Sequence, residues 1–208
     1  MPEFTLKPAT SAEHRTAVFR LRYDVYVKEM GRTQRYADHS RSQVEEPMDT
    51  AGHVVAAFAG AGDVVGTVRS NLLRLTSSTG LYEDLYDFAA LQPAVREYTS
   101  ITTKLIVHRD FRNTSLAAQL ARAAYRYGLE NGVEEDFIDC NAHLVQFFQR
   151  LGYKEVKPIT HPEYGDVMLL RLRLRDRAHL STVRFPFLRD LRVFEHRRRQ
   201  GRERALSI

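Results

Sequence analysis

The distribution of apolar residues in the first half of the chain predicts one helix followed by a β-hairpin. From Ala12 to Met30, apolar residues recur every three to four positions with arginine and lysine between them, which is typical of an amphipathic helix. His53–Ala59 and Val64–Leu73 are apolar, valine-rich runs separated by a glycine-rich turn, a pattern that predicts two antiparallel strands. The intervening stretch 32–52 is polar and lacks periodicity, so it is either disordered or functional.

The second half of the chain alternates strand-like runs with helical patterns. After the β-branched run Thr99–Val107, apolar residues at i, i+4 spacing predict a helix that begins near Asn113, a good N-cap residue, and ends near Gly132. The remaining predicted elements are a strand at Phe137–Cys140, a helix at Leu144–Leu151, strands at Tyr153–Lys157 and Val167–Leu174, and a basic amphipathic helix at Phe187–Arg204. Strands that alternate with helices in this order predict a mixed α/β sheet.

The composition narrows the class of protein. The chain has 208 residues, 43% apolar and 27% charged, as expected for one globular domain with appendages. Cys140 is the single cysteine, which excludes a disulfide framework, and the histidines show no zinc-type spacing, so no metal site is predicted. The first residues carry Glu3 and Lys7 without an apolar run, and no run approaches the roughly 20 residues that span a bilayer. We therefore expect a protein of the reducing cytoplasm.

The positive charge is concentrated at the C-terminal end. Arg171–Arg204 contains twelve arginines and four acidic residues, whereas the whole chain has a net charge of +5, so the rest of the chain is mildly acidic. Such a segment suits an acidic partner: a carrier protein, an anionic membrane surface or a nucleic acid. Nucleic acid ranks lowest, because no nucleic-acid motif is present. The alternatives are a solvated basic tail and a helix that packs on the domain through its Phe and Leu side chains.

The junction between the strand Thr99–Val107 and the next helix has the features of a phosphate site. The small residues Ser115 and Ala117 open the helix, whose N-terminus offers unpaired N–H groups and the positive end of the helix dipole. Phosphates bind at such ends, and Arg112 can add a charge-assisted contact. The alternative is a helix that simply starts at an Asn113 cap and binds no ligand.

Two motifs in this half are similar to those of the GCN5-related N-acyltransferase (GNAT) superfamily. Val107, Arg112 and Ala117 match its Val-x4-Arg/Gln-x2-Gly-x-Gly/Ala motif, with Ser115 in place of the first glycine. The segment 141–153 matches the second motif, an Asn followed by a short helix and aromatic-x-x-Leu-Gly-aromatic. The resemblance implies a GNAT fold with the donor's pantetheine arm between strands 99–107 and 137–140. Within that segment, residue 148 is Phe where many acetyltransferases have a tyrosine acid, which argues against an ordinary acetyl-CoA mechanism.

The N-terminal half resembles a narrower group, the acyl-homoserine-lactone synthases and the long-chain N-acyl amino acid synthases. The segments that carry this resemblance are Phe19–Gly31, Glu45–Asp49, His53–Val55 and Gly66–Arg69. Lactone synthases typically have a tryptophan after the first helix and an acidic residue on the central strand. This chain has no tryptophan, and it has Ile101 at the acidic position and Lys104 in place of arginine. A site for the cationic S-adenosylmethionine needs that carboxylate, so the N-acyl amino acid synthases are the better match.

Candidate site residues follow from the chemistry and from the resemblance. Glu45, Asp49 and Glu97 are candidate bases, because the ammonium of an amino acid must lose a proton before it attacks a thioester. Arg69 can hold a substrate carboxylate, the alternative being an exposed charge at a strand end. The resemblance adds Thr103 near the oxyanion, and Arg22 and Tyr26 to the substrate site. It places the phosphopantetheine donor against Lys104, Ile106, Val107, Arg112, Asn113, Thr114, Ser115, Leu116, Ala117 and Asn141.

Together these patterns predict a GNAT-like domain over residues 1–175 and a basic helical extension over 176–208. The expected reaction moves an acyl group from acyl carrier protein or CoA to the amine of an amino acid or a similar small molecule, without a metal. Two alternatives remain: a lactone synthase that uses S-adenosylmethionine, and a GNAT-fold binding module without catalysis.

Overall fold

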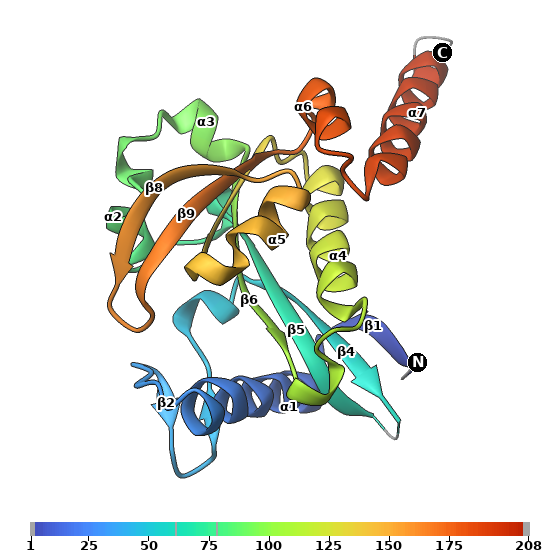
Figure 1. Ribbon diagram of the computed structural model, residues 1–208. Helices are drawn as coiled ribbons and strands as arrows, with labels where there is room; N and C mark the ends of the chain where they lie inside the picture. The colour runs from blue at the N-terminus through green and yellow to red at the C-terminus, as the bar shows by residue number, and fades with distance from the viewer. Residues whose placement is uncertain (1–2, 61, 78, 206–208) are drawn as a thin grey trace.

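A seven-stranded sheet in the order β1-β4-β5-β6-β7-β9-β8 forms the centre of the molecule (Figure 1). The computed structural model describes residues 3–60, 62–77 and 79–205. The strands of this sheet are β1 (Phe4–Pro8), β4 (His53–Ala59), β5 (Asp63–Leu72), β6 (Thr99–Val107), β7 (Glu135–Cys140), β8 (Lys154–His161) and β9 (Gly165–Arg173). Neighbouring strands are antiparallel except β6 and β7, which are parallel. A small separate hairpin pairs β2 (Ala37–Asp38) with β3 (Gln43–Val44).

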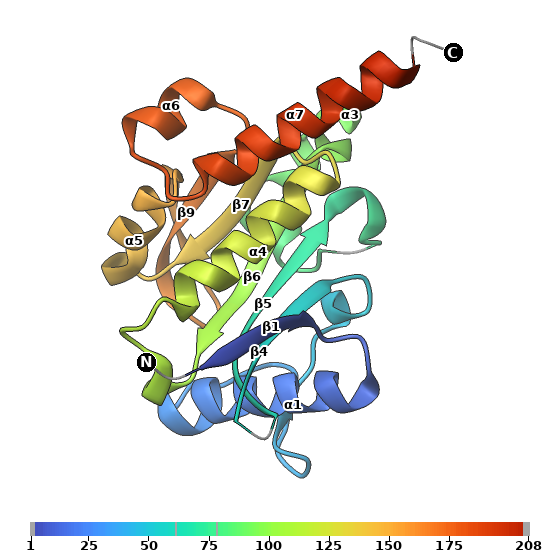
Figure 2. The same ribbon diagram turned by 90° about the vertical axis from the view of Figure 1, so that its right-hand side faces the viewer.

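Helices cover both faces of the sheet. They are α1 (Ala12–Tyr23), α2 (Tyr82–Leu85), α3 (Pro93–Glu97), α4 (Leu116–Glu130), α5 (Val145–Arg150), α6 (Arg177–Thr182) and α7 (Leu188–Ala205), and α1 continues into a π-helical turn at Asp24–Glu29. On β4, Val54 and Ala56 pack against α1, whereas Val55 and Ala57 pack in the cluster that contains α4. Because successive side chains of a strand point to opposite faces, α1 and α4 lie on opposite sides of the sheet. Figure 2 shows α4 lying across one face.

The contact between α4 and the sheet is close enough to require a glycine on β5. A Cβ atom added at Gly66 would lie 3.0 Å from Leu120 Cδ1, 3.1 Å from Leu116 Cδ2 and 3.2 Å from the Ile106 carbonyl oxygen. Leu116 and Leu120 are fully buried, so they cannot move aside without leaving the core. Gly66 therefore fixes how closely the first two turns of α4 approach the sheet.

The C-terminal segment begins as part of the main core. Leu180, Phe185, Phe187 and Leu191 are buried in the same cluster as residues of α4, β7 and β9. The arginines of α7 between residues 192 and 199 remain exposed. This corresponds to the expected packing through Phe and Leu with arginines in water, and α7 crosses the end of α4 in Figure 2. The boundary at residue 175 stays a prediction. No helix in residues 3–60, 62–77 or 79–205 is long and apolar enough to cross a membrane.

The predicted order of strands and helices is confirmed, and three details differ. The helix after β6 begins at Leu116, not near Asn113, because Asn113 is left-handed (φ 64°) and cannot act as the N-cap. Thr114 Oγ1 instead accepts a hydrogen bond from the Leu116 N–H (3.2 Å). The edge strand β1 and the short helices α2, α3 and α6 were not predicted. The polar stretch 32–52 is ordered and holds β2, β3 and a 3-10 turn at Pro47–Asp49.

Candidate active site

The parallel strands β6 and β7 separate part-way along their length and leave a cleft between them. Their pairing runs from Thr99 opposite Glu135 to Ile101 opposite Phe137 and stops there, although both strands continue. The cleft has a volume of about 140 Å³. Its lining residues are Tyr26, Met30, Arg32, Tyr82, Thr102, Thr103, Lys104, Leu105, Ile138, Asp139, Cys140, Asn141, Leu144, Phe148, Tyr164 and Val167. The cleft therefore lies at the place where the resemblance puts the pantetheine arm.

One wall of the cleft carries a β-bulge. Arg69 pairs with Thr103 and Thr67 pairs with Ile106, so Lys104 and Leu105 together face a single residue of β5. Lys104 has a positive φ of 55°, the left-handed conformation that non-glycine residues rarely adopt. A bulge leaves backbone groups outside the ladder, and bulges are frequent beside active sites. This bulge can direct backbone N–H groups into the cleft.

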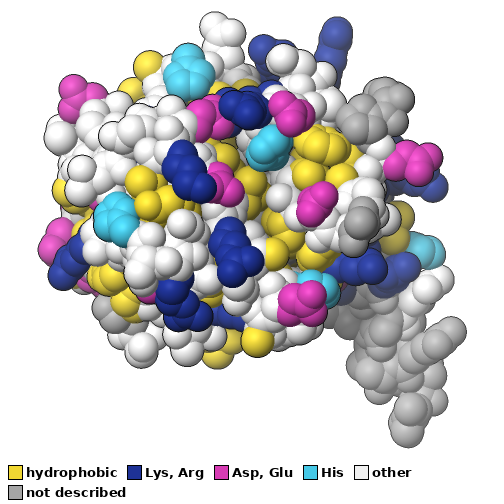
Figure 3. Space-filling view, turned by 90° about the horizontal axis from the view of Figure 1, so that it is seen from below, with side chains coloured by type: hydrophobic (Ala, Val, Ile, Leu, Met, Phe, Trp, Pro, Cys, Tyr) yellow, Lys and Arg dark blue, Asp and Glu magenta, His cyan; other side chains and the backbone are white. Residues whose placement is uncertain are grey.

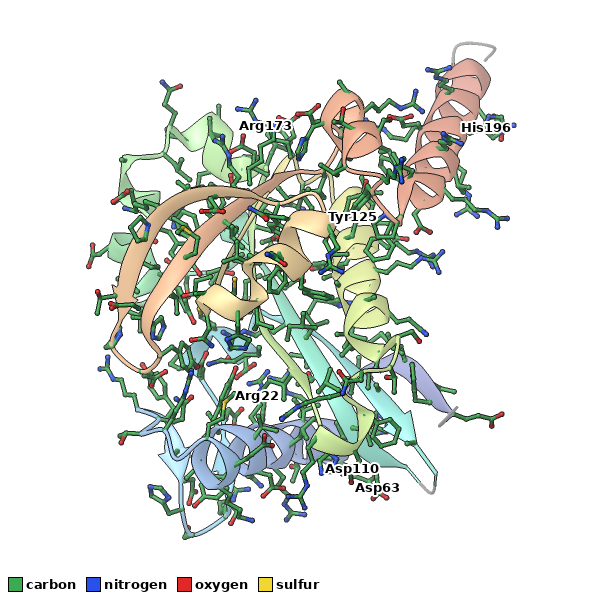
Figure 4. All side chains as sticks on the ribbon, viewed as in Figure 1. Arg22, Asp63, Asp110, Tyr125, Arg173 and His196 are labelled. Carbon is green, nitrogen blue, oxygen red and sulfur yellow. The ribbon has the colours of Figure 1, made fainter. Side chains whose placement is uncertain are left out.

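A network of buried charged side chains contacts the strand β6 at the bulge. Arg22 makes a two-point contact with Asp49 (2.7 and 2.9 Å), and Asp49 also lies 3.1 Å from Arg69. Arg69 bonds Glu46 Oε2 (2.7 Å) and donates to Thr103 Oγ1 (3.1 Å). The side chains of Arg22, Arg69 and Asp49 are completely buried, and Arg22 projects from α1 towards the sheet (Figure 4). Such pairs cost desolvation energy and hold only while every member is present.

Lys104 joins this network to the cleft. Its Nζ lies 2.5 Å from Glu46 Oε1 and donates to the Tyr164 hydroxyl (2.6 Å), and it lies 5.2 Å from the ring centroids of both Tyr26 and Tyr164. Burial alone would raise the pKa of Glu46, but Lys104 and Arg69 outweigh it and lower that pKa to about 2. Glu46 is therefore ionised at neutral pH and neutralises the charge of Lys104.

Five of the residues predicted from the sequence meet in this network, and two of the predicted bases do not. Arg22, Asp49, Arg69, Thr103 and Lys104 are brought together, and Tyr26 lies against Lys104. The two predicted bases outside the network are Glu45, whose side chain is exposed, and Glu97, which is exposed at the end of α3 and 3.8 Å from Arg74. Neither lines the cleft.

Glu46, the neighbour of Glu45, is the acid that the sequence reasoning missed. Its backbone N–H donates to Asp49 Oδ2 (2.8 Å), and the two side chains form a capping box around the 3-10 turn. Pro47 at the first position of that turn is the signal that could have found it, because an acid directly before a proline and another three residues later is the capping-box pattern.

Arg112 joins the start of α4 to the end of the π-helical turn. It makes a two-point ion pair with Glu29 (2.5 and 2.9 Å), and its Nε donates to the Val107 carbonyl oxygen (3.1 Å). Both side chains are about one-third exposed, so the pair contributes little, on the order of 0–1 kcal/mol. A phosphate group can therefore compete with Glu29 for Arg112.

The other predicted donor residues lie on both sides of this point. Asn113, Thr114, Ser115, Leu116 and Ala117 form the loop and first turn of α4, and Asn141 lines the cleft at the end of β7. The side chain of Ile106 does not line the cleft and is buried instead against Leu21 of α1 and Val25 of the π-helical turn. Phe148 is buried against Phe147 and Tyr153. The tyrosines that line the cleft are Tyr26, Tyr82 and Tyr164.

The sequence matches one protein-family model over most of its length. The family model described as "N-acyl amino acid synthase FeeM" matches residues 17–173, which is most of the chain. The chain belongs to the FeeM family. It is therefore an N-acyltransferase, and the resemblance drawn from its motifs is confirmed. No curated protein matched the sequence.

Solved structures show the same fold at low sequence identity. FeeM, an N-acyl amino acid synthase from uncultured soil microbes, superposes with a TM-score of 0.68 and 16% identity, covering 89% of this chain and 99% of that one. BjaI, a CoA-dependent acyl-homoserine lactone synthase solved with S-adenosylmethionine and isopentyl-CoA, gives 0.60 and 20%, covering 91% and 90%. An acetyltransferase from Lactobacillus plantarum gives 0.57 and 16%, covering 82% and 98%. The GNAT fold of this member of the FeeM family is thereby established.

Proposed function

We propose that this acyltransferase moves a long acyl chain from the phosphopantetheine thioester of acyl carrier protein to the α-amine of an amino acid. The observation that carries the proposal is the separation of β6 from β7 beside a left-handed bulge at Lys104. A pantetheine arm is thin and rich in amides, so it can lie between two strands whose facing backbone groups are not paired with each other. The thioester then sits next to the bulge.

The reaction is an aminolysis of the thioester. The amine nitrogen attacks the carbonyl carbon, the C–N bond forms, the C–S bond breaks, and the thiolate of the arm leaves. Negative charge develops on the carbonyl oxygen, and we assign its stabilisation to backbone N–H groups at the bulge of Lys104 and Leu105. We assign Thr103 a positioning role, because its hydroxyl accepts a hydrogen bond from Arg69.

The two ends of the donor fit two features beside the cleft. The phosphate end of the arm faces the positive end of the α4 dipole and Arg112, for which the phosphate competes with Glu29. The acyl end faces a small apolar cavity of about 20 Å³ that shares Thr102, Leu105 and Phe148 with the cleft. Phe185 and Phe187 lie on the lining of that cavity. A long chain enters as Phe148 and its neighbours shift, since interiors leave little unused space.

Acyl carrier protein is preferred as the donor because α4 and α7 share a basic surface. Arg122, Arg126, Arg189 and Arg197 line one groove between these helices. Two of them are paired within the groove, Arg122 with Asp190 (2.7 Å) and Arg126 with Glu130 (3.9 Å), so the four arginines outnumber the acids by two. The face around α1 instead mixes both signs of charge (Figure 3). A basic surface attracts an acidic protein or an anionic membrane. We rank nucleic acid below both.

The lactone-synthase alternative is less well supported by the residues of the site. Ile101 is fully buried in the cluster that holds Phe88 and Phe137, so no carboxylate is present at that position. Glu46, the buried acid that contacts Lys104, is already bonded to Lys104 and Arg69. A cationic sulfonium would find no free negative charge on this wall.

The test uses purified enzyme with acyl carrier protein loaded with acyl chains of several lengths and a mixture of amino acids. Thiol release and mass spectrometry of the products together report both substrates. We expect N-acyl amino acids, and we expect Arg112→Ala to raise the KM for the donor, while Arg109→Ala, at an exposed neighbour 3.8 Å from Asp110, leaves it unchanged. Acyl-homoserine lactones formed from S-adenosylmethionine, or donor binding without any thiol release, would refute the proposal.

A further inference from the structure

Two charged groups in the cleft, Arg32 and Asp139, form no ion pair within 4.0 Å among residues 3–60, 62–77 and 79–205. Arg32, Lys104 and Asp139 are the lining residues that carry full charges, and Lys104 is neutralised by Glu46. Within the part of the chain that the structure describes, no carboxylate lies within 4.0 Å of the Arg32 guanidinium. One cation and one anion therefore face the same cleft.

Arg32 is held in place by groups that do not neutralise it. Its guanidinium lies 5.1 Å from the centroid of the Tyr164 ring, and its Nη2 is 3.5 Å from Asn141 Oδ1. Its backbone N–H is fixed to the Tyr26 carbonyl oxygen (2.9 Å). An arginine stacked on an aromatic ring keeps its planar N–H groups directed at a ligand, and two such groups match a carboxylate.

Asp139 is the anion on the other wall. It follows Ile138 on β7, and its Oδ2 is buried without a hydrogen-bond partner among the residues of the described ranges. Burial raises the pKa of Asp139 to about 6. The Tyr86 hydroxyl, whose approach to this carboxyl lies outside ordinary hydrogen-bond geometry, and the charge of Lys104 only partly offset that increase. The ionisable groups that face it are Tyr82, Tyr86, Lys104, Glu46, Tyr164 and Cys140. A buried acceptor without a well-placed donor is costly, so a ligand that donates to Asp139 is stabilised there.

We propose that the cleft receives the acceptor as a zwitterionic α-amino acid, with the carboxylate on Arg32 and the ammonium on Asp139, which serves as the base. The inference rests on the proposed function. The ammonium gives one proton to Asp139, and the neutral amine then attacks the thioester carbon. The second proton of the amine passes to the leaving thiolate, and Asp139 returns its proton to solvent. A base of pKa near 6 remains ionised at pH 7 and accepts the proton only transiently.

The test compares two variants with two matched controls in the full-length enzyme, using acyl carrier protein as donor. Arg32→Gln is paired with Arg35→Gln, and Asp139→Asn with Asp166→Asn, because Arg35 and Asp166 are exposed and outside the cleft. The readouts are KM for the amino acid, KM for the donor, kcat against pH, and activity on the corresponding amine that lacks the carboxylate.

Arg32→Gln should raise the KM for the amino acid at least tenfold while the KM for the donor stays constant, and the amine without a carboxylate should be insensitive to the change. Asp139→Asn should lower kcat by roughly 10²- to 10⁴-fold at pH 7, remove the acid limb of the pH profile near 6, and recover at alkaline pH as solvent deprotonates the amine. Recovery at high pH separates lost base function from misfolding.

The inference is overturned if Arg32→Gln changes only the KM for the donor, which would place a phosphate on Arg32, or if Asp139→Asn keeps the wild-type profile. Either result leaves the proposed function intact, provided that wild type makes N-acyl amino acids. Absence of product from wild-type enzyme with every amino acid would instead refute the proposed function itself.

Discussion

Removing the charge of Asp49 should destabilise the fold more than any exposed substitution. Asp49 is completely buried and bonds Arg22 at two points, lies 3.1 Å from Arg69, and accepts the backbone N–H of Glu46. In Asp49→Asn both guanidinium groups stay buried with one negative charge fewer. Breaking a buried pair in this way costs about 3–5 kcal/mol.

That cost is large compared with the stability of an ordinary domain, which is about 5–15 kcal/mol. For a chain of this size 1 kcal/mol corresponds to roughly 2–4 °C, so we expect Tm to fall by roughly 6–20 °C. The assay is thermal and urea unfolding at pH 7, with Glu45→Gln as the matched control because Glu45 is exposed. A Tm within 3 °C of wild type would show that the two arginines are stabilised in some other way.

The pH dependence provides a second check on the same residue. Burial raises the pKa of Asp49, but Arg22 and Arg69 outweigh burial and hold it well below the ordinary value of 3.8. The folded state therefore keeps the carboxylate ionised where the unfolded chain protonates it. The stabilisation is complete above about pH 4 and is lost as the pH falls through the lower, folded pKa. The difference in stability between wild type and Asp49→Asn should thus shrink from pH 4 to pH 2, and a constant difference would refute the reasoning.

Three further predictions concern other parts of the structure. Burial raises the pKa of Asp136 to about 6 from 3.8, so the native state binds the proton more tightly and wild type loses stability as the pH rises from about 4 to 6. The free energy of unfolding in urea should therefore rise for Asp136→Asn relative to wild type by about 2–3 kcal/mol as the pH goes from about 4 to 7. An unchanged difference would contradict the raised pKa. Phe187→Ala enlarges the apolar cavity. Its kcat/KM for an acyl chain two carbons longer than the one that wild type uses best should therefore exceed the wild-type value about tenfold, at about 0.8 kcal/mol per buried methylene. An unchanged dependence on chain length would place the acyl chain elsewhere. Gly66→Ala should cost about 1–3 kcal/mol in urea unfolding, because the new methyl group meets Leu116 and Leu120; a neutral result would mean that α4 moves freely.

The sequence was sufficient for those parts of the fold that depend on local patterns. The valine-rich runs on either side of a glycine-rich turn became β4 and β5, and the β-branched run before the motif became β6. The strand β1 escaped prediction because Phe4–Pro8 is short, carries Lys7, ends in proline and pairs on one side only. Asn113 was assigned as a cap on propensity alone, but its left-handed backbone makes it part of the loop.

The site was predictable in its family residues and not in its tertiary contacts. Which of the two adjacent glutamates, Glu45 or Glu46, is buried depends on how the 3-10 turn at Pro47 packs in the fold. The local sequence does not determine that packing. The importance of Arg32 depends on the ring of Tyr164, which lies more than a hundred residues away in the chain. Asp139 carried a usable signal, since a third acid in the short buried strand Glu135–Cys140 is unusual and calls for a partner.

For the zwitterionic acceptor proposed above, Ile101 and Lys104 on β6 leave its positive charge to be met on the opposite wall of the cleft. With Ile101 in the apolar cluster, β6 offers no carboxylate, and Lys104 on the same strand carries a positive charge. Glu46 is held by Lys104 and Arg69, so its charge is already balanced. The ammonium of an acceptor would be repelled by this wall unless a second anion compensates. Asp139 on β7 is the cleft residue that can do so, and a ligand that satisfies it needs a cationic amine on that side and a carboxylate near Arg32.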